Sequence, residues 1–360
     1  MCRPNHKDFQ HVKAFPVSKI SAVIAAAASA SQADTASAQI AAPVAGTTTF
    51  SVEGGVAFSN FSNSAFPAGA VPFIPQSLGK TGFTPQSFGD LDPGQRTGGY
   101  GSFSIARNFD ALNDWRFSAG FFNFRTGDHS ASASQAFTNF DNFTATNLAS
   151  VTERDRFGLY TSDFDFGRNF VAGILRVRAF AGVRTLYTNE QFDATFHTEG
   201  TDKTGNFASA LTVTDSQLQG RSSFLGVGPR AGVDTFIGST FGIVGHASAA
   251  LLAGYRQSSF STSSTSTVTF SEPDSVLPKV ASAAATGPGA NYLVNNGTDW
   301  VGHLAGSLGA AWQFSPNGQL VIGYKLEKWW NVRESFGFAG FDKKQDILVQ
   351  TPFIKATLRF

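Results

Sequence analysis

Four acidic and three basic residues recur at alternate positions along two neighbouring segments. This spacing makes them the strongest candidates for charge-based chemistry. The acidic residues, all at odd positions, are Glu153, Asp155, Asp163 and Asp165. The basic residues, all at even positions, are Arg176, Arg178 and Arg184. Side chains two residues apart share one face of a β-strand, so each set would form a charged face if these segments are strands.

An antiparallel hairpin would bring the two charged faces together. With a tight turn near Asn169, two registers are open: one places Asp163 opposite Arg176, and the other places Asp163 opposite Arg178. Opposite charges directly across two strands contribute about 0.2–1 kcal/mol per pair. Both registers are therefore favourable.

Such a hairpin suits two roles. Its charges could form a constriction that filters ions, or a salt-bridged wall that fills the lumen of a narrow barrel. The inferred lumen carries nine basic and seven acidic candidates. They are Arg116, Arg176, Arg178, Arg184, Arg230, Arg256, Lys325, Lys355 and Arg359, with Glu53, Glu153, Asp155, Asp163, Asp165, Asp234 and Glu327. This near balance favours the structural role and predicts no strong ion selectivity.

Catalytic, metal and nucleic-acid chemistry find little support in the sequence. His246 and His303 share inferred lumen faces with Ser248 and Ser307, but no motif fixes a catalytic triad. Two distant histidines and a single cysteine, Cys2, do not form a zinc-site pattern. The net charge of +1 gives no basic surplus. We therefore expect no enzyme, no metal or other cofactor and no nucleic-acid partner.

The segments that carry these residues have the pattern of membrane-spanning strands. No run approaches the ~20 consecutive apolar residues of a membrane helix, which excludes helical spans. A strand crosses in about 9–11 residues and is apolar only on its lipid face. Period-2 alternation predicts ten strands, near residues 48–59, 96–109, 114–126, 151–167, 171–190, 221–236, 240–257, 299–314, 319–330 and 347–360.

The connections between these strands alternate between short and long. The short ones contain the sequences DALN, GRNF, IGST and SPNG. The long ones lie near 60–95, 127–150, 191–220, 258–298 and 331–346. Outer-membrane barrels have short periplasmic turns and long external loops. The pattern predicts an all-β fold, a transmembrane antiparallel up-and-down β-barrel of about ten strands, with eight or twelve as alternatives.

The end of the chain has a two-faced strand. Leu358 and Phe360 share an apolar face, and Lys355 lies on the opposite face. A terminal phenylalanine after such alternation resembles the strand that outer-membrane proteins present for assembly, so we expect Phe360 and Leu358 to act as an assembly signal. Aromatic residues also gather at predicted strand ends, as interface anchors do: Trp115, Phe117, Tyr255, Trp312, Phe314, Trp329, Trp330 and Phe360.

The first 38 residues have the composition of a secretory signal peptide. A basic stretch contains Arg3, Lys7, Lys13 and Lys19, and a short Ala-rich apolar run covers residues 20–30. The small residues that follow allow cleavage after Ala33 or Ala38. Residues 1–33 carry four Lys/Arg and one Asp, so their removal changes the net charge from +1 to −2. We expect residues 39–360 to form the barrel.

Two motifs within residues 224–256 resemble a known family. The first, GVGPRAGVD, matches at Gly226, Gly228, Pro229, Arg230, Gly232 and Asp234. The second, ASAALLAG, matches at Ala247, Ala249, Ala250, Leu251, Leu252 and Gly254. They resemble strands of the pore-forming major outer-membrane protein family of the Legionella type. The resemblance implies an outer-membrane barrel with porin-like or surface-binding activity, and it brings no catalytic residue.

These observations predict a protein of the bacterial outer membrane. The leading function is passive passage of small hydrophilic solutes or ions. The alternative is a structural or adhesive surface barrel with a plugged lumen, because side chains fill small barrels. Expected partners are outer-membrane lipid and lipopolysaccharide, the barrel assembly machinery, and small solutes. The sequence leaves the solute and the oligomeric state open.

Overall fold

The computed structural model describes most of the chain after residue 44. The described residues are 45–61, 95–125, 129–138, 143–204, 208–271, 281–283, 291–337 and 340–360. The expected signal peptide, with both cleavage positions, lies outside them, as does most of the expected loop at 60–95. The described part contains no helix that is long and apolar enough to cross a membrane.

The regular elements of the described residues are strands. They are β1 (Thr48–Phe61), β2 (Gln95–Asn108), β3 (Asn113–Arg125), β4 (His129–Thr138), β5 (Phe143–Ala172), β6 (Leu175–Thr204), β7 (Ala208–Gly238), β8 (Phe241–Ser271), β9 (Ala281–Ala283), β10 (Asn291–Ser315), β11 (Gly318–Gly337) and β12 (Gly340–Arg359).

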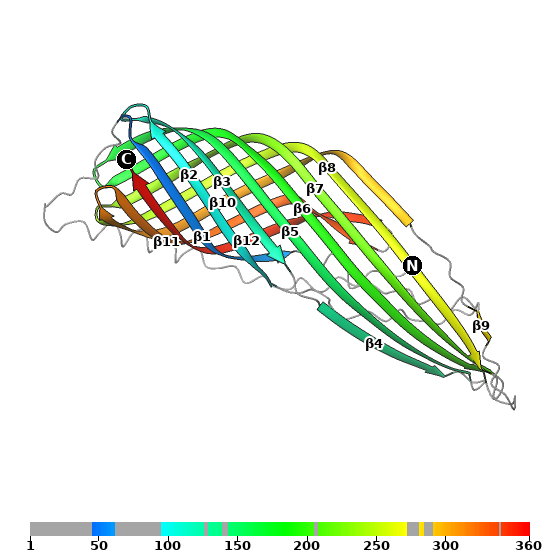
Figure 1. Cartoon of the computed structure of the whole chain (residues 1–360). Helices are drawn as coiled ribbons and strands as arrows, with labels where there is room; N and C mark the ends of the chain where they lie inside the picture. Colours follow the sequence, from blue (N-terminus) through cyan, green and yellow to red (C-terminus); the bar gives the residue numbers. More distant parts are fainter. Residues whose placement is uncertain are drawn as a thin grey trace, which may run out of the picture. The chain divides into compact units, whose positions relative to one another are not determined.

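Ten of these strands form a closed antiparallel ring, which confirms the predicted barrel (Figure 1). Neighbours in sequence pair with each other around the ring, β12 pairs with β1, and β8 pairs with β10. The short strands β4 and β9 lie outside the ring and pair with β5 and β8. Closure removes the sheet edges at membrane depth, and this is how a β-barrel pairs its backbone amides in lipid.

At one end of the barrel, four connections of two to four residues join β2 to β3, β5 to β6, β7 to β8 and β10 to β11. The first and last strands also meet there, where Thr48 and Phe360 exchange two backbone hydrogen bonds of 3.1 and 2.9 Å. In the β2–β3 turn, Asp110 accepts hydrogen bonds of 2.7 Å from the N–H groups of Leu112 and Asn113. Hydrogen bonds from the Asn113 side chain, together with these two backbone bonds, hold the pKa of Asp110 below its usual range. Short turns mark this end as periplasmic.

The turn of the charged hairpin differs from the prediction. It lies at Gly173 and Ile174, four residues after the predicted position near Asn169. Gly173 has a φ of +59°, and glycine at the first position of a two-residue turn is typical of type II′ hairpins. Gly167, in the predicted turn, is a strand residue instead. A Cβ at position 167 would lie 2.3 Å from Nε of Arg178, so the glycine leaves room for the Arg178 side chain.

Strands also extend into four segments that were predicted to be loops. Strands β6 and β7 cover all but three residues of 191–220, and β5, β8, β10, β11 and β12 enter the other three segments. Inward apolar side chains support this extension, since Phe192, Phe196, Leu218 and Phe260 are buried. The Ser and Thr residues that suggested loops alternate with them, and a strand accommodates such residues on a face open to water.

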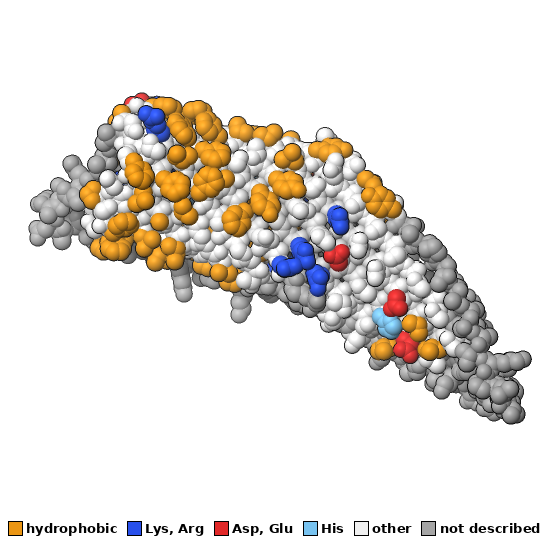
Figure 2. Space-filling model, viewed as in Figure 1, with side chains coloured by type: hydrophobic (Ala, Val, Ile, Leu, Met, Phe, Trp, Pro, Cys, Tyr) orange, Lys and Arg blue, Asp and Glu red, His pale blue; other side chains and the backbone are white. Residues whose placement is uncertain are grey.

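The outer surface carries an apolar band next to the periplasmic end (Figure 2). Outward side chains such as Val183, Leu251 and Ile354 are about half exposed, and lipid would cover them. Phe121, Tyr160, Tyr187 and Tyr255 are exposed on β3, β5, β6 and β8 where the band ends. Such aromatic residues are typical of the lipid–water boundary, so they define the external edge of the band.

Candidate functional site

The interior of the barrel contains the predicted charged hairpin, with its charges paired. Asp163 lies directly opposite Arg184. The carboxylate accepts hydrogen bonds of 2.6 and 2.7 Å from Nε and Nη2 of Arg184. Neither predicted register is correct, because both placed Asp163 opposite Arg176 or Arg178. The later turn at Gly173 shifts the pairing.

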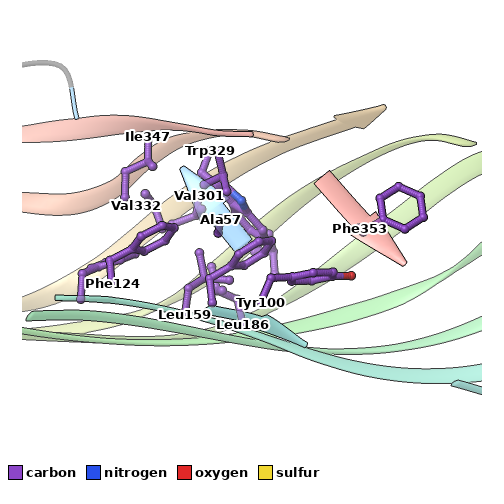
Figure 3. Packing of buried hydrophobic residues seen from close by; sticks show 14 of the residues in the cluster. Ala57, Tyr100, Phe124, Leu159, Leu186, Val301, Trp329, Val332, Ile347 and Phe353 are labelled. Atoms are coloured by element: carbon purple, nitrogen blue, oxygen red, sulfur yellow. The ribbon is translucent and has the colours of Figure 1, made fainter. Parts of the chain in front are cut away.

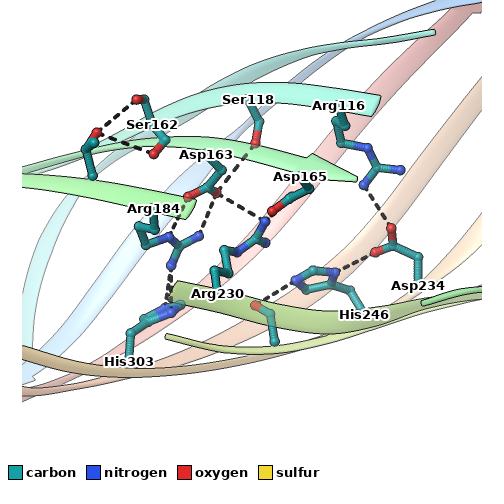
Figure 4. Close-up of polar contacts among 12 residues, drawn as sticks. Arg116, Ser118, Ser162, Asp163, Asp165, Arg184, Arg230, Asp234, His246 and His303 are labelled. Carbon is teal, nitrogen blue, oxygen red and sulfur yellow. Dashed lines mark hydrogen bonds and ion pairs between the residues drawn. The ribbon is translucent and has the colours of Figure 1, made fainter. Parts of the chain in front are cut away.

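The charged layer continues across strands β3, β5, β6 and β7 (Figure 4). Arg230 pairs with Asp165 and lies 3.5 Å from Asp163. Arg178 forms a salt bridge of 2.6 Å with Asp114 and one of 3.2 Å with Asp234. Separating the partners of such an ion pair would leave an unpaired charge in the interior, which is strongly destabilising. These pairs therefore hold their side chains in one geometry.

The layer reaches the opposite wall through a histidine and a lysine. Nη1 of Arg184 lies 2.6 Å from Nδ1 of His303. Nε2 of His303 in turn lies 3.6 Å from Glu327. Lys325 forms a salt bridge of 2.7 Å with Glu53, and its ammonium group lies 4.2 Å from the centre of the Tyr100 ring. The charges therefore line the lumen from β3 to β1 in two ion-paired groups, which meet at the ring of Phe180 between Arg178 and Arg230.

The predicted lumen residues do not all belong to this layer. Asp163, Asp165, Arg178, Arg184, Arg230, Lys325 and Glu327 belong to it. Arg176 and Lys355 lie nearer the periplasmic mouth, where both line a cavity, and Arg176 donates a hydrogen bond of 3.3 Å to Asn169. Asp155 lies in a separate charged cluster nearer the external end. Leu358 and Phe360 point outward.

That external cluster contains residues that the sequence pattern did not predict. Arg333 is fully buried and pairs with Asp155 and Glu190. Arg96 also pairs with Asp155. Arg333 was overlooked because it lies in a segment predicted to be a loop. The alternation of inward residues in β6 already placed Glu190 on the face of Arg184, and this was the available signal.

An apolar plug separates the two charged regions. It consists of inward side chains from all ten strands of the ring and includes Phe122, Phe124, Leu159, Leu186, Phe224, Leu252, Val301, Trp329, Ile347 and Phe353 (Figure 3). Each of these side chains is at most 5 % exposed. Tyr100 and Phe122 stack at 4.8 Å between ring centres. In this structure, side chains therefore fill the lumen at the level of the plug.

The position of Trp329 shows that one prediction about the aromatic residues is wrong. It was expected at the membrane interface, but it points into the lumen and is 1 % exposed. Its ring lies 3.9 Å from that of His303, and Nε1 donates a hydrogen bond of 3.3 Å to Glu327. Trp329 therefore joins the plug to the charged layer. Its neighbour Trp330 lies on the other face of β11 and is partly exposed.

A cavity of about 510 Å³ lies on the periplasmic side of the plug. Asn317 and Arg359 line it at the periplasmic mouth, and Trp329 and Phe353 line it at the plug. Charged residues of the layer form much of its wall. The cavity can therefore hold water and small polar solutes next to paired charges.

Three cavity residues have the connectivity of a hydrolytic triad. Asp234 contacts Nδ1 of His246 at 2.6 Å, and Nε2 of His246 lies 3.1 Å from Oγ of Ser248. However, Asp234 also pairs with Arg116 and Arg178, which neutralise its charge. Strand β8 is paired on both sides at Ser248, so its backbone amides serve the sheet and offer no preorganised oxyanion hole. We assign these contacts to the structure of the wall.

The described residues contain no group of three or more His, Cys, Asp or Glu side chains that could hold a metal ion. The acidic side chains instead accept hydrogen bonds from arginine, lysine and histidine.

The motif residues Arg230 and Asp234 both belong to this charged layer. Gly232 lies beside Phe180, and a Cβ there would come within 2.5 Å of its ring. Arg178 and Arg230 both lie over this ring, at 5.1 and 4.7 Å.

A family model described as Legionella pneumophila major outer membrane protein precursor matches residues 101–360. The matched segment contains eight of the ten ring strands in full, from β3 to β12. No curated protein matches the chain.

Several solved outer-membrane structures are similar to the chain. The outer membrane protease OmpT from Escherichia coli has 8 % identity over 88 % of this chain and 96 % of its own, with a TM-score of 0.35. The transport unit of the autotransporter AIDA-I from Escherichia coli has 8 % identity over 95 % and 98 %, with a TM-score of 0.26. The Pseudomonas putida toluene transporter TodX has 9 % identity over 87 % and 89 %, with a TM-score of 0.21.

Proposed function

Because this chain belongs to the Legionella major outer membrane protein family of the bacterial outer membrane, we propose that it is a porin-like barrel for small hydrophilic solutes or ions, closed in this structure by its apolar plug. One observation supports this proposal most directly: a charge-lined cavity extends from the periplasmic mouth to the plug. A barrel with only a structural role needs no such polar chamber. Passage would require the plug to rearrange.

Trp329 is the plug residue best suited to a test. It is large, almost fully buried, and in contact with both His303 and Glu327. Replacing a buried Trp by Ala removes about 3–5 kcal/mol of packing, so Trp329→Ala is expected to raise the open probability at least about tenfold. Single-channel recordings in planar bilayers would measure this change. Trp330→Ala, at the neighbouring position on the other face of β11, serves as the matched control.

A second function is supported by the plug itself. Its side chains are almost completely buried, and charged residues on both sides of it are paired. These features suit a structural or adhesive surface barrel whose external strands present a binding surface. If the wild-type protein and Trp329→Ala are both silent in bilayers while correctly folded, the barrel is a surface protein and the porin proposal is wrong.

We also propose that Phe360 and Leu358 act in assembly by the barrel assembly machinery. Both point outward at the seam where β12 meets β1, and Phe360 is 78 % exposed. Deleting Phe360 is expected to reduce the amount of folded protein in the outer membrane several-fold, because the last strand must close the ring. Deleting residues 270–290, which join the end of β8 to β10, should cost much less, since connections between the strands of a barrel tolerate change. Membrane yields and heat-modifiable mobility on gels would measure both, and equal yields would contradict the proposal.

A further inference from the structure

Four arginines form a basic patch on the outer wall of the barrel, beyond the external edge of the apolar band. They are Arg125, Arg154, Arg156 and Arg221, and all lie on outward faces of β3, β5 and β7. Figure 2 shows Lys and Arg side chains gathered at this level, with an acidic side chain beside them. On this side β6 and β7 extend far beyond the apolar band, opposite to the periplasmic turns, so the patch faces the external leaflet.

The backbone register fixes the spacing of the patch. Arg125 lies directly opposite Arg156, and both are four residues beyond the boundary aromatics of their strands, Phe121 and Tyr160. Four strand residues span about 13 Å, or roughly 10 Å along the axis of a barrel with strands tilted by 35–45°. Arg221 lies two strands from Arg156, about 10 Å away. The guanidinium groups therefore occupy the depth of lipid headgroups.

Within the part of the chain that the structure describes, the patch carries more positive than negative charge on the outer wall. Several described outward side chains lie within four residues of the patch along the strands. One of them is acidic: Asp193 on β6, which lies opposite Arg154. Arg125, Arg156 and Arg221 form no ion pair with any residue that the structure describes. Like charges directly opposite each other destabilise a sheet. An anion between Arg125 and Arg156 would remove this cost.

A groove beside Arg221 adds a site for a larger ligand. Its volume is about 440 Å³. Its walls include Tyr187, Asn189, Gln257, Tyr292 and Asn296, as well as Arg221. Tyrosine rings and side-chain amides offer the stacking surfaces and hydrogen-bonding groups that sugars use. The groove thus places sugar-binding groups next to a phosphate-binding one.

We propose that the basic patch and this groove bind the phosphorylated sugar headgroup of the glycolipid that forms the outer leaflet of the outer membrane. The phosphates would pair with the arginines, whose planar guanidinium groups form bidentate hydrogen bonds to phosphate. The sugar would occupy the groove, and the acyl chains would cover the apolar band below Phe121 and Tyr160. The bound lipid would therefore contact both the band and the external wall.

Binding of lipid A to protein purified from outer membranes and stripped of lipid in detergent would test this proposal. The double variant Arg125→Gln/Arg156→Gln is expected to bind diphosphorylated lipid A at least about tenfold more weakly than the wild type, since two charge-assisted hydrogen-bonding groups are lost. The matched control is Arg107→Gln/Arg168→Gln, which removes two exposed outward arginines at the periplasmic end. The control should bind within about twofold of the wild type.

Three further measurements test the role of the lipid phosphates, the identity of the ligand and the contribution of Arg221. Dephosphorylated lipid A should bind the wild type more weakly, and inorganic phosphate at the same concentration should not displace the lipid. Equal binding by the double variant and the control, or equal binding of both forms of lipid A, would overturn the proposal. Displacement by inorganic phosphate would overturn the glycolipid as the ligand. If the double variant does not fold, Arg221→Gln alone must weaken binding, and unchanged binding by it would likewise overturn the proposal.

Discussion

Replacing Asp163 by Asn is expected to lower the free energy of unfolding by about 3–5 kcal/mol, because it leaves buried positive charge without its partner. Asp163 pairs with Arg184 through two hydrogen bonds and lies close to Arg230. Arginine cannot give up its proton in a protein. Arg184 and Arg230 therefore stay charged in the variant, and the cost of burying an unpaired charge remains. Urea unfolding in lipid vesicles, followed by tryptophan fluorescence, would measure the loss.

The matched control for Asp163→Asn is Asp215→Asn. Asp215 pairs with His197 at 2.7 Å, but on the outer wall, where both side chains are largely open to solvent. An exposed pair contributes about 0–1 kcal/mol. The double variant Asp163→Asn/Arg184→Met should recover part of the loss, because it removes the unpaired charge. Equal losses for Asp163→Asn and Asp215→Asn would show that the charged layer does not stabilise the barrel.

Val183→Arg is expected to destabilise the folded barrel by about 2–4 kcal/mol, because it places a charge on the lipid face near the bilayer midplane. Val183 is 48 % exposed and lies in the middle of the lipid-facing part of β6, which ends at Tyr187. The same titration in vesicles would measure the change. The adjacent Arg184 is tolerated because it points inward to Asp163.

Val177→Arg is the control for depth. Val177 lies on the same outward face, two residues after the first residue of β6 and close to the periplasmic boundary. Near an interface the cost of an arginine falls to about 0–1 kcal/mol. A loss at position 177 as large as that at 183 would contradict the placement of the bilayer. No loss at either position would contradict the assignment of the two faces of β6.

Period-2 alternation was sufficient to assign the two faces of most strands. Ile354 and Leu358 point outward and Thr357 inward, as the alternation in the last strand predicts. The alternation of short and long connections likewise predicted that ten strands form a closed ring. These features are local in sequence, because side chains of a strand alternate whatever lies next to it.

The plug was missed although the sequence contained a signal for it. Residues 121–124 and 157–160 are mostly apolar on both faces, in contrast to the alternating segments around them. Segments apolar on both faces occur where both faces are buried. In β3 and β5 the outward residues Phe121 and Tyr160 face lipid, and the inward residues Phe122 and Leu159 fill the lumen.

The sequence by itself determined the strands, their faces and the closed antiparallel architecture, because these depend on neighbours along the chain and on the need to pair every amide in lipid. Tertiary structure decided which charges meet. One glycine turn, at Gly173, set the register that pairs Asp163 with Arg184. Closure of the ring brought Lys325 to Glu53 across more than 270 positions of sequence. Contacts across a lumen depend on register, tilt and closure together, and no local pattern records them.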